Sequence, residues 1–131
     1  MREILFRGKD CNGKWRIGLL VHIVNSWCIS YWAGIAIVTD VIPDTISQYT
    51  GLTDNNGTKI FEGDILERKH KELLNHSQKA VVKFIPVKAC FLAVDIDGEN
   101  VEFISTYIND EYSLEVIGNI YDNPELLEVE E

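Results

Sequence analysis

The stretch QYTGLTDNNGTKIFEGDIL, residues 48–66, decides the fold because it joins apolar runs through dense turn chemistry. Asn56 and Gly57 form a dipeptide that tolerates the positive φ of a tight hairpin turn. Gly63 then allows a sharp entry into a further strand, where the Asp64 carboxylate can accept hydrogen bonds from nearby backbone amides. We interpret Asn56, Gly57, Gly63 and Asp64 as a structural turn motif rather than a catalytic elbow.

The segment before this hairpin alternates with a period of two, which indicates a strand. Five apolar residues share one side of that strand: Trp15, Ile17, Leu19, Val21 and Ile23. The turn at Asn25 and Ser26 predicts a returning strand over residues 27–38, with Gly34 as a bulge or bend. Pro43 forbids a central strand, so a loop with at most one helical turn is expected next.

The segment after the hairpin contains further strand patterns, over residues 64–68, 80–87, 89–96, 101–104 and 112–121. Residues 69–78 fit either one or two helical turns or an excursion between strands. Asn123 and Pro124 predict the N-cap and first position of a last helical turn. The pattern predicts an all-β, mainly antiparallel protein: an N-terminal hairpin portion, a small barrel- or sandwich-like sheet and few helical turns. We expect one domain over residues 1–131, with sub-portions 1–47 and 48–131.

Composition and net charge limit the kinds of molecule that this protein is expected to bind. The chain has 131 residues, 46% of them hydrophobic, and a net charge of −9. An acidic field disfavours binding to phosphate backbones, and the lysines at 69, 71, 79, 83 and 88 do not define one face. Cys11, Cys28 and Cys90 form no CxxC pair, which predicts reduced thiols in a cytoplasmic protein. The longest apolar region, residues 27–42, is too short and too polar to span a bilayer.

Six short motifs, spread in order over almost the whole chain, resemble the YopX family of phage and prophage proteins. They are REILFR (2–7), GKW (13–15), QYTGL (48–52), NG (56–57), IFEGDI (60–65) and VIGNIYDNPELL (116–127). The chain departs from the family at residues 8–10, where a Trp-Asp or Tyr-Asp pair is usual, and over residues 69–79. The resemblance implies a mainly β protein encoded by a phage or prophage of a low-GC bacterium, so the cytoplasm expected from the cysteines is that of the bacterial host cell. It implies no catalytic residue and no cofactor.

Three carboxylates are candidates for chemistry. Glu62 and Asp64 stand two residues apart, and Asp54 lies across the hairpin from them. Such a group can bind a metal or act as acid and base, so a small metal- or acid/base-dependent enzyme is one alternative. The structural alternative is that carboxylates beside glycines in turns accept hydrogen bonds from the backbone.

Other catalytic patterns are weak. His70 and His76, together with Cys90 or His22, lack the paired spacing of a structural zinc site, so surface histidines in a loop are expected. The sequence has no GxSxG, Walker or GxGxxG pattern. A cysteine hydrolase that uses Cys28 or Cys90 with His22 stays open. We expect no cofactor and no metal.

The aromatic residues suggest binding to a protein. Trp15, Trp27, Tyr31 and Trp32 lie in one hairpin whose two faces both carry apolar groups. They form a candidate interaction surface, because Trp and Tyr often anchor interfaces; the alternative is that they form the core. We therefore expect a non-enzymatic module whose partner is a host protein or a second copy in a homo-oligomer. Nucleic-acid binding by stacked bases is a third alternative.

Overall fold

The computed structural model describes residues 2–73, 75–98 and 100–128. It divides into two compact units, residues 1–51 and residues 52–131. The sequence placed a division slightly earlier, at residues 47 and 48. Whether the two units act as one YopX-like domain stays a prediction.

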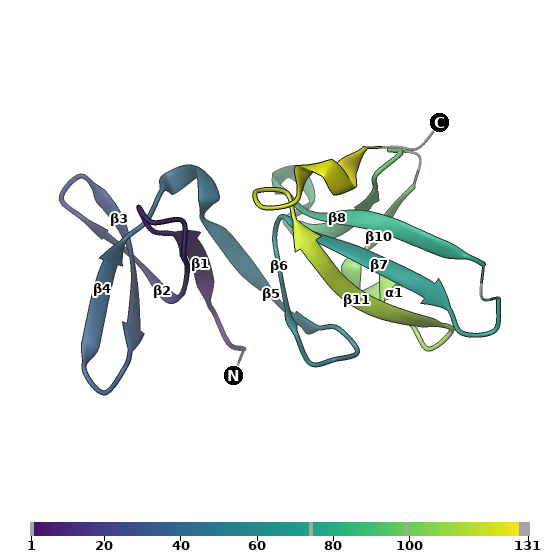
Figure 1. The fold of residues 1–131 in the computed structure, drawn as a ribbon, viewed down its shortest axis with the longest axis horizontal. Coiled ribbons are helices and arrows are strands. Elements are labelled where there is room, and N and C mark those ends of the chain that lie inside the picture. Colours follow the sequence, from purple (N-terminus) through teal and green to yellow (C-terminus); the bar gives the residue numbers. More distant parts are fainter. Residues whose placement is uncertain (1, 74, 99, 129–131) are drawn as a thin grey trace. The chain divides into compact units, whose positions relative to one another are not determined.

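The first four strands of the first unit form an antiparallel meander, and the fifth returns to pair with the first (Figure 1). Its elements are β1 (Phe6–Lys9), β2 (Trp15–Ile23), β3 (Ser26–Trp32), β4 (Ala36–Asp40), the 3₁₀ turn η1 (Pro43–Thr45) and β5 (Ser47–Thr53). The strands pair antiparallel in the order β4-β3-β2-β1-β5, and β6 (Lys59–Phe61) follows β5 in that order. β5 itself crosses the division between the units.

Two local expectations for this unit were wrong. Residues 27–38 do not form one strand, because Gly34 adopts a φ of +81° and turns the chain between β3 and β4. The preceding turn uses Val24 and Asn25, because Ser26 already belongs to β3.

A glycine inside β2 permits the close approach of β3. A Cβ atom at Gly18 would collide with the carbonyl oxygen of Ser30 on the neighbouring strand. The alternating segment forms one continuous strand over residues 15–23, with a glycine inside it that no larger residue can replace without a collision.

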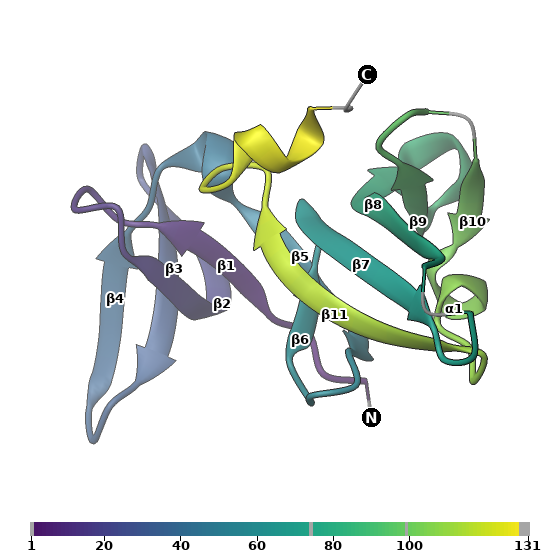
Figure 2. The ribbon, with the colours of Figure 1, turned by 45° about the vertical axis from the view of Figure 1, so that its right-hand side comes forward.

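The second unit is an open five-stranded antiparallel sheet in the order β10-β9-β8-β7-β11. Its elements are β6 (Lys59–Phe61), β7 (Asp64–His70), β8 (Ser77–Ile85), η2 (Pro86–Lys88), β9 (Cys90–Asp95), β10 (Val101–Phe103), α1 (Ile104–Tyr107), β11 (Tyr112–Asn119) and η3 (Pro124–Leu127). Figure 2 shows β7 and β11 side by side. The all-β, antiparallel class is confirmed, and in the described residues neither sheet closes on itself.

The core of the second unit packs against one face of this sheet. It contains Ile60, Leu66, Ala80, Val82, Ala93, Ile104, Tyr107 and Leu114. The helical turn α1, which the sequence did not predict, supplies Ile104 and Tyr107 to this core.

The segment expected over residues 69–78 is shorter than predicted, because β7 extends to His70 and β8 begins at Ser77. Residues 74 and 99, in this loop and in the turn expected at 97–100, lie outside the described residues.

Candidate functional site

One face of β2, β3 and β4 exposes large apolar side chains to solvent. The register pairs Leu19 with Ser30 and Ser30 with Val38, so these positions share a face. By strand alternation the same face carries five side chains that we call the apolar face: Ile17, Leu19, Ile23, Trp32 and Val38. Their exposed fractions run from 46% for Ile23 to 76% for Trp32. Residues 17–51 contain no lysine or arginine, so the cations beside this face are Arg7 and Lys9 of β1, which the register pairs with Ile17 and Trp15.

The four aromatic residues expected to form one surface lie on two faces. The register pairs Trp27 with His22, and their rings stack with centroids 4.4 Å apart. Tyr31 shares that face, and its hydroxyl accepts a hydrogen bond of 3.1 Å from Arg16. Trp15 and Trp32 lie on the opposite face, which is the apolar one. Of the four, Trp32 is the most exposed.

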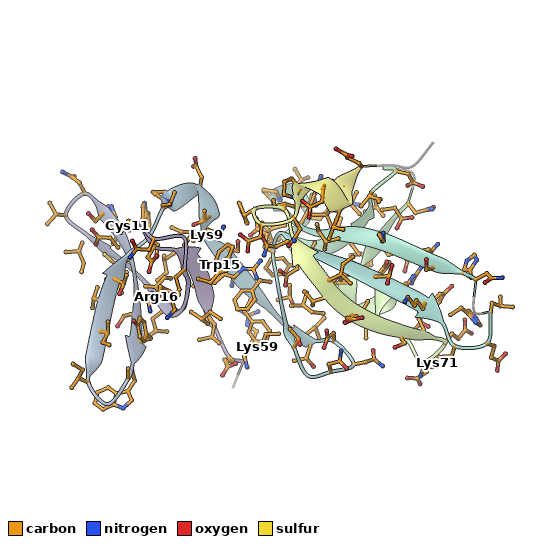
Figure 3. All side chains as sticks on the ribbon, in the orientation of Figure 1. Lys9, Cys11, Trp15, Arg16, Lys59 and Lys71 are labelled. Atoms are coloured by element: carbon orange, nitrogen blue, oxygen red, sulfur yellow. The ribbon has the colours of Figure 1, made fainter. Side chains whose placement is uncertain are left out.

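Trp15 is half-buried beneath two cations. The Arg7 guanidinium lies 4.7 Å from the centre of its ring and the Lys9 ammonium 5.3 Å from it. Figure 3 shows Lys9 and Trp15 close together on the first two strands. Cation–π contacts of this kind hold an aromatic ring in place, so Trp15 contributes to the structure of the β1–β2 hairpin.

The thiol of Cys28 is held in its neutral form. It is buried on the apolar side of β3 and donates a hydrogen bond of 3.1 Å to the Asp40 carboxylate. This bond, together with burial and the negative charge of Asp40, raises the pKa of the Cys28 thiol. The register also places Cys28 and His22 on opposite faces of the sheet. A hydrolase based on Cys28 and His22 is therefore wrong, because the His22 imidazole lies on the other face and cannot take the proton from the Cys28 thiol.

Two of the three candidate acid–base carboxylates accept hydrogen bonds from backbone amides. The Asp54 carboxylate accepts hydrogen bonds from the amides of Asn56, Thr58 and Val116, at 2.8–3.0 Å. The Asp64 carboxylate accepts one from Phe61 at 2.8 Å. Both side chains are buried, as the structural alternative expects. Within the described residues no three His, Cys, Asp or Glu side chains gather to hold a metal ion.

A pocket of about 540 Å³ lies on the second unit. Its wall is mostly apolar, from Val81, Phe84, Ile85, Ile96, Ile120 and Leu127, with Glu62 and Lys83 as its charged residues. Asp54 and Asp64 do not line it. An acid–base site needs carboxylates that converge in a cavity, and this pocket receives one of the three.

The remaining predicted turn and histidine residues have structural roles. Gly57 and Gly63 adopt φ values of +81° and +86°, and the amide of Asn56 bonds to Asp54. Nδ1 of His70 accepts hydrogen bonds from the amides of Glu72 and Leu73, which closes the loop after β7. A ring nitrogen that is bonded to the backbone in this way is not available to a metal.

The negative charge of the chain is unevenly divided. Residues 1–51 carry five Lys or Arg against four Asp or Glu, whereas residues 52–131 carry seven against 17. The first unit is therefore close to neutral, at +1, and the second carries −10. The exposed apolar face belongs to the near-neutral unit. No helix in the described ranges is long and apolar enough to cross a membrane.

The sequence matches the family described as YopX protein over residues 22–128. The chain belongs to the YopX family. No match is found among curated proteins. The fold is similar to that of the crystal structure of protein EF1440 from Enterococcus faecalis, with a TM-score of 0.63 and 23% identity over 98% of this chain and 100% of the other.

The YopX motif near the C-terminus has a structural role. The Asn119 side chain accepts hydrogen bonds from the amides of Tyr121 and Asp122 and donates one to the Asp122 carboxylate. Asn123 occupies the N-cap position of η3 and Pro124 begins the turn, as predicted, but the Asn123 side chain accepts a hydrogen bond from the amide of Asn119 and makes no cap bond to η3. A Cβ atom at Gly118 would lie 2.5 Å from the Asn123 oxygen. The family motif thus encodes a compact turn after β11.

Sequence reasoning missed most of the apolar face. Ile17, Leu19, Ile23 and Val38 were assigned to strands without a stated exposure. The sequence contained one relevant signal. Residues 17–39 include no Asp, Glu, Lys or Arg, so no charged side chain indicates which side of these strands faces solvent. Pattern alone cannot tell which of two apolar sides is covered.

Proposed function

We propose that this YopX-family chain is a non-enzymatic interaction module that binds a protein through the apolar face of β2, β3 and β4. The observation that carries the proposal is the group of five large apolar side chains exposed together on one sheet face. Isolated exposed apolar residues are ordinary, whereas a contiguous group is typical of an interaction site. Covering each of these side chains contributes roughly 1 kcal/mol to binding.

We further propose that the protein is a phage or prophage accessory protein in the bacterial cytoplasm. The YopX motifs support the first part. The three free cysteines, one of which is exposed, support a reducing compartment. A partner there is expected to present an apolar surface with little charge, because the five side chains of the apolar face are themselves uncharged.

The test is a capture experiment from bacterial lysate with and without nuclease, followed by mass spectrometry and by rebinding of the purified candidate. We expect the variant Leu19→Ser, Trp32→Ser to lose the captured protein while its circular dichroism spectrum is unchanged. The matched control is Val87→Ser, which removes an isolated apolar side chain that is 96% exposed in η2. Equal capture by the wild type and the double variant would overturn the proposal. Loss of capture with nuclease would point to nucleic acid.

A further inference from the structure

The outermost strands of the two sheets differ in how their edges are protected. In the second unit, the hairpin turn between β5 and β6 covers the edge of β11. The Asn55 amide donates to the Leu114 carbonyl oxygen, the Leu114 amide donates to the Asn55 side chain, and the Val116 amide donates to Asp54. The opposite edge strand, β10, has only three residues. Covered and very short edges are common means of preventing association.

The edge of β4 has no such protection. Its five residues, Ala36–Asp40, pair with β3 on one side, and within the described ranges their backbone bonds to no other element. Figures 1 and 2 show β4 as the last strand of its sheet. The strand contains no lysine, proline or glycine, which are the residues that usually discourage pairing. It therefore presents a row of unpaired backbone donors and acceptors.

We propose that β4 pairs antiparallel with β4 of a second copy of this chain. This deepens the proposed function, on which it rests, by naming one protein partner. A twofold axis at Val38 places the two Val38 side chains opposite each other, Ile37 opposite Thr39, and Ala36 opposite Asp40. The single charged residue of the strand then faces an alanine. The strand is thus complementary to itself, with no like charges opposed.

The division of charge favours the same partner. Two copies that meet through residues 1–51 bring together units of net charge +1, whereas contact through residues 52–131 opposes two units of −10. The pairing also extends the apolar face. Val38 belongs to that face, and Trp32 is paired with the small Ala36 beside the edge. The two apolar faces therefore continue into one another across the β4–β4 junction.

The contact is expected to be weak and dependent on concentration. Two five-residue strands bury well below the roughly 800 Å² per partner of a standard stable interface. We expect a monomer–dimer equilibrium that sedimentation velocity detects between about 10 μM and 1 mM. A pair of such faces would bind a further partner more tightly than one face through avidity.

The experiment compares wild type, Val38→Lys, Val38→Glu and Val38→Thr by sedimentation velocity across that range, with circular dichroism to confirm folding. Val38→Lys opposes two cations on the axis, so we expect its dissociation constant to rise more than about tenfold. Val38→Thr keeps a neutral β-branched side chain and should keep the dimer. An equimolar mixture of Val38→Lys and Val38→Glu should restore association, which a merely unfolded variant cannot do.

The matched control is Leu19→Lys, which places the same charge on the apolar face but two strands away from the edge. We expect this variant to retain the dimer. A wild type that is monomeric throughout, or a dimer that Leu19→Lys disrupts as strongly as Val38→Lys, would overturn edge pairing. If the wild type is monomeric but still captures a host protein that Leu19→Ser, Trp32→Ser loses, the inference fails and the proposed function stands.

Discussion

The carboxylate of Asp54 accepts a hydrogen bond of 3.0 Å from the backbone amide of Val116, which lies 62 residues further along the chain. The same side chain closes its own hairpin through the amides of Asn56 and Thr58. One buried carboxylate therefore forms a local turn and also covers the edge of the last strand of the sheet. This dual role explains why a charged residue is buried in a turn.

We expect Asp54→Asn to destabilise the protein by about 1–3 kcal/mol, because an amide group cannot accept bonds at both positions and one buried amide loses its partner. Urea unfolding measures the change. The control is Asp110→Asn at an exposed position, where we expect a change within about 0.5 kcal/mol. Equal effects at the two sites would contradict the role assigned to Asp54.

Arg68 is another buried charged residue with a structural role. Its guanidinium lies 4.0 Å from the ring centre of Tyr107 and 4.3 Å from that of Tyr112. It also donates hydrogen bonds to Gln78 and to Glu102, at 2.7 and 3.0 Å. We expect Arg68→Lys to cost about 2 kcal/mol or more, because an ammonium group cannot stack between two rings and maintain that fork of bonds. Thermal and urea unfolding check this.

The neighbouring residue provides the comparison for Arg68. Lys69 also forms an ion pair, at 3.5 Å from Glu67, but its side chain is 63% exposed. Surface pairs of this kind contribute about 0–1 kcal/mol, so Lys69→Ala should be nearly neutral. If Lys69→Ala were as destabilising as Arg68→Lys, the stacking and burial around Arg68 would not be the source of its effect.

The hairpins were predictable from sequence because their turns are encoded locally. The turns at Asp10 and Asp54 share the pattern Asp-x-Asn-Gly, and in both the aspartate bonds to the amides two and four residues later. Local chemistry is sufficient for such a turn. By contrast, α1 has four residues and no side-chain cap, so its stability depends on packing of Ile104 and Tyr107 in the core.

The candidate site was less predictable, because exposure depends on which elements cover which face. Trp27 and Trp32 belong to the same strand, yet Trp27 stacks on His22 and Trp32 is 76% exposed on the other face. The motif residues that identify the family, such as Asn119 and Asp64, bond to backbone amides. Family membership therefore predicts the fold of this chain better than its chemistry.

At acidic pH the stability of the protein should depend on the ionised carboxylate of Asp10. The Lys14 amide, and further bonds from Arg16 and Asn12, hold the pKa of this carboxyl below its ordinary value of 3.8. A lowered folded-state pKa stabilises the protein fully above the ordinary value, and this contribution is lost as the pH falls through the folded pKa. We expect Asp10→Asn to reduce the loss of stability below about pH 4 in urea unfolding experiments. An unchanged acid profile would show that Asp10 does not contribute.

Val24 occupies a backbone conformation that a β-branched residue rarely adopts. Its φ is +54°, at the exposed turn between β2 and β3. A side chain in this region costs about 1–2 kcal/mol, whereas glycine adopts it freely. We expect Val24→Gly to stabilise the protein by up to about 1 kcal/mol. The gain is reduced because glycine gives the unfolded chain more conformational entropy to lose on folding. The control is Ala89→Gly, at a φ of +49°, where the smaller side chain predicts a smaller gain. Destabilisation by Val24→Gly would mean that the valine side chain contributes packing that outweighs its strain.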